Sequence, residues 1–142
     1  MYPQTNKQVD VETAFRKPYL ISWLAIPVLL LAGFLFRKHT VNIQLYDTYF
    51  VIANSHVALA GSALLLILGL GYWLILLTGK SPNVALTLFH LLPTIGVPML
   101  LALPMFSSDS LGSAQWLSLV VLAFIAGQCV FVVNILMTLL RK

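Results

Sequence analysis

The chain has 142 residues, of which 60% are hydrophobic and only 8% are charged. Soluble domains carry about 25% charged residues, so this composition excludes a water-soluble globule and predicts a protein whose solvent is lipid. The net charge of +4 comes from residues near the ends of apolar segments. Such charges orient a membrane protein, and they form no stripe of the kind that binds nucleic acid.

The chain is expected to begin with a polar cytoplasmic segment, residues 1–17, that shows no cleavable signal pattern. Residues 18–142 are expected to form a single membrane domain. A membrane helix needs about 20 apolar residues. Four segments satisfy this requirement and predict an all-α bundle or arc of four spans: 19–36, 48–77, 83–105 and 112–140.

Turn-forming residues separate the later spans. Residues 78–82 read Thr-Gly-Lys-Ser-Pro, and residues 106–110 read Phe-Ser-Ser-Asp-Ser. Pro93 and Pro98 fall inside the third span, where each removes a backbone donor. That helix should therefore kink, or pack against a neighbour that satisfies the freed carbonyl groups.

The basic residues are divided unequally between the two sides of the predicted membrane domain. Arg37 and Lys38 fall on one side, with Asp47 and Asp109. The other side carries the larger set: Lys7, Arg16, Lys17, Lys80, Arg141 and Lys142. The positive-inside rule places the larger set in the cytoplasm. Both termini are therefore expected to be cytoplasmic in a multi-pass protein of a bacterial-type inner membrane.

The segment 44–56 reads Gln-Leu-Tyr-Asp-Thr-Tyr-Phe-Val-Ile-Ala-Asn-Ser-His. It resembles the start of the tenth helix of subunit I in haem-copper oxidases, which include cytochrome c and quinol oxidases. That family reads Gln-Leu-His-Asp-Thr-Tyr-Tyr/Phe-Val-Val-Ala-His-Phe-His there, and its helix also begins on the outer side. Residues 69–73, Gly-Leu-Gly-Tyr-Trp, resemble the end of the same helix, and residues 126–134 resemble the family's last helix. The chain thus resembles the last four helices of subunit I standing alone.

The resemblance implies a haem site in the second span. In the family, the first histidine of the His-x-His pair binds the high-spin haem and the second binds the low-spin haem. Here these positions are Asn54 and His56. Residues two apart on a helix point about 200° apart, so the loss of the first imidazole leaves the second haem face intact. His56 is therefore a candidate haem ligand, with Asn54 and Gly61 expected to face the haem, whose type is left open.

Several of the family's metal ligands have no counterpart in this chain. The family's loop histidine is Tyr46 here, and only the adjacent Asp47 is kept, either as a metal ligand or as the N-cap of the following helix. The copper ligands of the family belong to helices that this chain lacks, so no copper is expected. An oxygen reductase cannot be built from this chain alone, and the sequence favours a protein that is not an enzyme.

His90 is the other histidine within a predicted span. It should lie about 15–20 Å deeper in the membrane than His56, so the two cannot share one iron. A structural hydrogen bond is the favoured interpretation of His90, and a separate second site is the alternative. His56 also has a simpler interpretation, as a buried or interfacial histidine in a scaffold without a cofactor.

Two functions from different classes remain. One is a small haem-binding membrane protein for electron transfer, or for handling haem or a gas. The other is a cofactor-free structural, assembly or accessory subunit of a respiratory oxidase. Subunit I is built as three four-helix arcs, which favours a homotrimer of this chain. A dimer could instead bring two His56 side chains to one iron, and a fragment of a split oxidase is a further possibility. A proton-conducting pore has the least support, because no acidic residue lies in mid-membrane.

Overall fold

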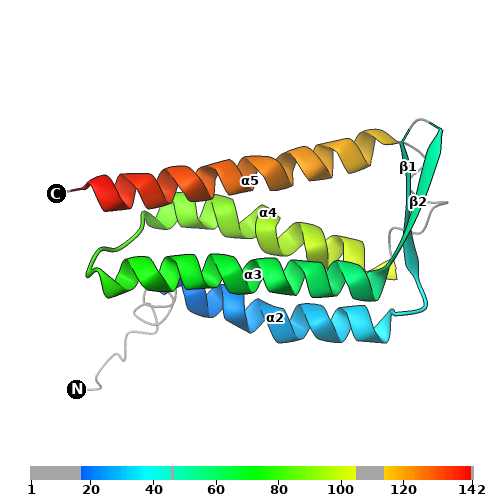
Figure 1. Ribbon diagram of the computed structural model, residues 1–142, viewed down its shortest axis with the longest axis horizontal. Helices are drawn as coiled ribbons and strands as arrows, with labels where there is room; N and C mark the ends of the chain where they lie inside the picture. The colour runs from blue at the N-terminus through cyan, green and yellow to red at the C-terminus, as the bar shows by residue number, and fades with distance from the viewer. Residues whose placement is uncertain (1–16, 46, 105–113, 142) are drawn as a thin grey trace, which may run out of the picture.

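The computed structural model describes residues 17–45, 47–104 and 114–141. For residues 44, 45, 49 and 114–116 it describes the backbone alone. The elements follow in the order α2 (Pro18–Leu35), β1 (Thr40–Leu45), β2 (Thr48–Ala53), α3 (Asn54–Leu77), α4 (Val84–Ala102) and α5 (Ala114–Leu140). Figure 1 shows the helices side by side along the long axis, with the two strands across one end.

The described residues include four helices that are long and apolar enough to cross a membrane. This confirms the prediction of a helical chain with four segments of membrane-spanning length. The start of α2, the connection from α3 to α4 and the end of α5 lie at one end of the molecule (Figure 1). We call this end the basic end, because its described charged residues are Lys17, Lys80 and Arg141. We call the opposite end, with Arg37, Lys38 and Asp47, the hairpin end.

The strands β1 and β2 are an addition to the predicted all-helical fold. They pair antiparallel, with Thr40 opposite Ala53 and Leu45 opposite Thr48. The predicted second span began at residue 48, but residues 48–53 are strand and the helix begins only at Asn54. The segment is rich in β-branched and aromatic residues, which favour a strand when a partner is available. The partner here is the equally β-prone segment that precedes it.

Local chemistry fixes the connection between α3 and α4. Gly79 has a φ of 75°, a left-handed conformation that glycine adopts without strain just beyond a helix end. Asn83 then caps α4, because its side-chain oxygen accepts hydrogen bonds from the backbone N–H groups of Ala85 and Leu86 at 2.9 and 3.4 Å. The predicted turn at residues 78–82 therefore reverses the chain within a few residues.

Small residues let the helices approach closely. A Cβ atom on Gly61 of α3 would come within 2.8 Å of both Leu29 of α2 and Pro98 of α4. Similarly, a Cβ atom on Gly127 of α5 would come within 2.7 Å of Pro93 of α4. Both prolines of α4 therefore face a glycine on a neighbouring helix. Such close packing is the main attraction between apolar helices in lipid, where there is no hydrophobic drive to associate.

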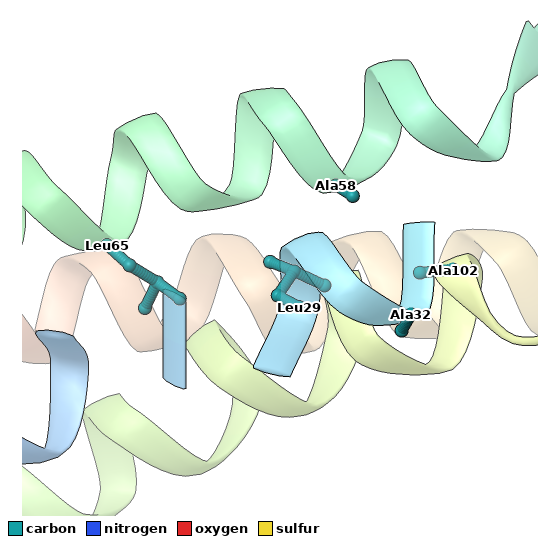
Figure 2. Close-up of a cluster of buried hydrophobic side chains, with 5 residues drawn as sticks. All are labelled: Leu29, Ala32, Ala58, Leu65 and Ala102. Carbon is teal, nitrogen blue, oxygen red and sulfur yellow. The ribbon is translucent and has the colours of Figure 1, made fainter. Parts of the chain in front are cut away.

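The apolar core lies between α2, α3 and α4, towards the hairpin end. Figure 2 shows its five members converging from the three helices: Leu29, Ala32, Ala58, Leu65 and Ala102. Helix α5 lies outside this core. It packs along α4 and has few contacts with α3. Only 11% of its apolar stretch is buried in the protein. The helices thus form an open arrangement with α5 at one edge.

Candidate functional site

His56 lies in the first turn of α3 and its side chain is exposed. Its neighbours on the helix, Asn54 and Ala58, are buried against α4 and α2 respectively. Each lies about 200° around the helix from His56. The imidazole therefore points away from both helices, and it makes no hydrogen bond to any residue that the structure describes.

The surface of α3 below His56, towards the middle of the membrane, carries small side chains. Ala60 and Ala63 are both exposed and lie one and two turns further into the membrane, within about 40° of the direction of His56. Leu59 and Ile67, which are 58% and 64% exposed, stand beside and below them. We call the surface formed by His56, Ala60 and Ala63 the His56 face. A flat group could lie on it between the larger side chains.

Asn54 lies on the opposite side of α3 and is buried. Its side-chain nitrogen donates to the Ala102 carbonyl at the end of α4, at 3.1 Å. Its backbone N–H donates to the His39 carbonyl at 3.2 Å, which ties α3 to the residue before β1. The Asn54 amide thus joins the ends of two helices, and its side-chain oxygen has no hydrogen-bond partner among the described residues.

The Asn54 side of the helix is filled by protein. Gly61 lies on this side against Leu29 and Pro98, with no room even for a Cβ atom. The pocket beside Asn54, between β1 and the end of α4, has a cavity volume of about 10 Å³, enough for about one water molecule. Among the described residues, Asn54 and Gly61 thus face protein, whereas the His56 face is open.

Asp47 lies between the two strands and is exposed. It lies before β2, so it cannot cap α3, which begins at Asn54 with Ala53 in the N-cap position. Among the described residues, no group of three or more His, Cys, Asp or Glu side chains could hold a metal ion.

His90 belongs to a different part of the molecule, in the half towards the basic end. Its Nδ1 atom lies 2.9 Å from the Tyr72 hydroxyl of α3, and both side chains are fully buried. Phe131 of α5 packs against both rings, with centroids 5.0 Å from Tyr72 and 4.8 Å from His90. The three aromatic rings thus join α3, α4 and α5.

This contact also fixes the depth of His90 relative to His56. His90 lies level with Tyr72, which is 16 residues along α3 from His56. At 1.5 Å per residue the two histidines differ in depth by about 24 Å, more than the sequence alone predicted. The helix begins later than expected, and this moves His56 closer to the hairpin end.

Further polar side chains extend the contact between α4 and α5. Gln128 donates to the Thr94 hydroxyl at 2.9 Å. Asn134 donates to the Thr87 hydroxyl at 3.0 Å and accepts from the backbone N–H of Asn83 at 3.0 Å. Sequence reasoning did not identify these partners on α4. The spacing of Asn83, Thr87, His90 and Thr94, at i, i+4, i+7 and i+11, marks one helix face and could have revealed them.

Comparisons with protein-family models, curated proteins and solved structures find no match to this chain. The resemblance to subunit I therefore rests on the motifs quoted above.

Proposed function

We propose that this chain is a small, oxidase-subunit-I-like membrane protein that binds haem through His56. The observation that carries the proposal is an exposed imidazole on a membrane-spanning helix, with no partner among the described residues. An ionisable side chain within a membrane-spanning helix is by default a candidate for function. Imidazole is a common axial ligand of haem iron, and the low surface of Ala60 and Ala63 leaves room for a porphyrin beside it.

The proposed site lies near the outer surface of the membrane. Helix α3 has 24 residues and is therefore about 36 Å long, compared with about 30 Å for the hydrocarbon core. His56 in its first turn is then close to the boundary between hydrocarbon and headgroups. Haem bound there would supply reversible one-electron chemistry or a coordination site for a gas. The protein would act in electron transfer, or in handling haem or a gas.

Oxygen reduction is not part of this proposal. Asn54 stands where the family places its high-spin haem ligand, and it is committed to the end of α4. An amide is a poor ligand for iron compared with imidazole.

The distribution of charge supports an orientation with the basic end in the cytoplasm. Lys17, Lys80 and Arg141 share that end, as the positive-inside rule requires of the cytoplasmic side. The hairpin and His56 would then face outwards from a bacterial-type inner membrane.

The test is the visible absorption spectrum of the purified protein, oxidised and after reduction with dithionite. Wild type should show a haem Soret band with reduced α and β bands, and His56→Ala should lose them. His39→Ala is the matched control, because His39 is also an exposed histidine at the hairpin end, and it should keep the spectrum. A wild-type protein that stays colourless after haem is added would contradict the proposal.

A second candidate function is a cofactor-free structural, assembly or accessory subunit of a respiratory oxidase. The observation that favours it is the close packing around Gly61, where Leu29 and Pro98 fill the space between helices without any bound group. In this case His56 binds water or lipid headgroups at the interface. Tagged wild type and His56→Ala would then retain oxidase subunits equally from detergent-solubilised membranes.

A further inference from the structure

The His56 face supplies only half of an axial ligand set. We propose that two copies of this chain, related by a two-fold axis along the membrane normal, hold one haem between their two His56 imidazoles. This inference rests on the haem-binding function proposed above and names the partner that completes the site: a second copy of the same chain.

No other described side chain of the same copy can supply the second ligand. His90 is buried about 24 Å deeper. Met99 packs against the apolar core between the helices. The His39 ring packs edge-on against Phe36 after the end of α2, and His39 lines the pocket beside Asn54, on the side of α3 opposite His56. The described part of the same copy therefore offers no second ligand, and in the proposed arrangement a second copy supplies it.

A two-fold axis along the membrane normal satisfies the requirement for a second ligand at the same depth. Rotation about this axis leaves depth unchanged, so both His56 side chains lie at one level. A two-fold interface also brings the same surface of each copy together, so the imidazoles approach the iron from opposite sides. In a symmetric trimer, each His56 face would meet a different surface of its neighbour, and each interface would receive a single His56.

The shape of the His56 face matches this arrangement. Ala60 and Ala63 present only methyl groups one and two turns below the imidazole, so a ring standing parallel to the helix axes can extend downwards between two copies of α3. Ile67 lies three turns below His56 and is 64% exposed, which limits the depth that the ring can reach. Large side chains flank the His56 face on one side: Leu59 and Leu66 are 58% and 48% exposed. The small residues are thus confined to the face itself.

The first experiment measures stoichiometry and coordination by titrating haem into the detergent-purified full chain. The expected result is saturation at one haem for every two chains, with the sharp α and β bands of six-coordinate, low-spin iron. A mixed dimer of wild type and His56→Ala, isolated with two different tags, should lose these sharp bands. Saturation at one haem per chain, or five-coordinate iron in wild type, would overturn the dimer while leaving haem binding by His56 in place. Absence of haem binding would overturn both proposals.

A second experiment fills the space below the imidazole without touching it. Ala63→Trp should abolish the sharp bands, because the indole would occupy the position of the ring. Ala85→Trp is the matched control, an exposed alanine in the first turn of α4, at the opposite end of the molecule from His56, and it should bind haem as wild type does. Equal helical content of the two variants by circular dichroism shows that both fold. Unchanged haem binding by Ala63→Trp would contradict the proposed position of the ring.

A third experiment needs no haem. In a background without the chain's single cysteine (Cys129→Ser), Ala63→Cys should give a covalent dimer in membranes with a bismaleimide whose spacer bridges the gap left for the ring, a gap too wide for a disulfide. Ala85→Cys, at the start of α4, should stay monomeric. The opposite result would place the contact between copies at the start of α4 and contradict the proposed two-fold axis.

Discussion

Tyr72 and His90 illustrate how a polar pair is accommodated inside a bilayer. Their hydrogen bond, at 2.9 Å, satisfies the phenol and one nitrogen of the imidazole where no water is present to do so. The Nε2 atom of His90 has no such partner among the described residues. The imidazole is thus held at one nitrogen by the Tyr72 hydroxyl and by packing against the surrounding rings.

Removal of that hydroxyl should therefore weaken the bundle. Tyr72→Phe keeps the ring contacts with Phe131 but leaves His90 Nδ1 without its partner. We expect a loss of about 1 kcal/mol in the free energy of unfolding, typical of one hydrogen bond between membrane helices. Reversible unfolding in mixed detergent micelles measures this change. Tyr19→Phe, whose ring packs edge-on against Trp23, is the control and should change stability little. Equal stability of the two variants would contradict a stabilising role for the pair.

At the scale of elements, α5 depends on amides rather than on apolar burial. Only Gly127, Asn134 and Thr138 are buried among its residues with described side chains. Asn134 alone makes two contacts with Asn83 and one with Thr87. Since apolar surface gains nothing by moving from lipid to protein, the helix is held in place by these hydrogen bonds, by the Gly127–Pro93 contact and by the Phe131 ring contacts.

The substitution Asn134→Leu should accordingly loosen α5. Three hydrogen bonds averaging about 0.6 kcal/mol each in membranes predict a loss of about 2 kcal/mol in unfolding free energy. Faster labelling of a cysteine placed at the buried Thr138, in a Cys129→Ser background, would report the same change locally. Val133→Leu on the exposed face of α5 is the matched control and should leave both measurements unchanged. If the cysteine were labelled as slowly in Asn134→Leu as in wild type, apolar packing alone would be sufficient to hold α5 in place.

The helices and the hairpin differ in how far the sequence predicts them. Apolar runs of membrane-spanning length locate α2 to α5, because length and hydropathy are local properties. The strand at residues 48–53 was not predicted, since its apolar residues run straight into those of α3 and only pairing with residues 40–45 separates them. The candidate site is also predicted only in part. The motif identified His56, but only the packing of Ala58 and Asn54 decides which way its imidazole points.

For the whole molecule, the four candidate membrane-spanning helices among the described residues and the unequal charges predict one orientation. The connection that contains Lys80 should be cytoplasmic, and the hairpin should be outside. In a Cys129→Ser background, Asp47→Cys should react with a membrane-impermeant maleimide added to intact cells. Ser81→Cys should react only after the membrane is opened. The reverse pattern would contradict the orientation and place His56 at the cytoplasmic surface.

The direct passage of β2 into α3 has a mechanical consequence. Ala53 ends the strand and Asn54 begins the helix, so no loop lies between them to absorb a displacement. The hydrogen bond from the Asn54 backbone N–H to the His39 carbonyl stabilises the same junction. A displacement of the hairpin at the membrane surface is therefore passed directly to the first turn of α3, which carries His56.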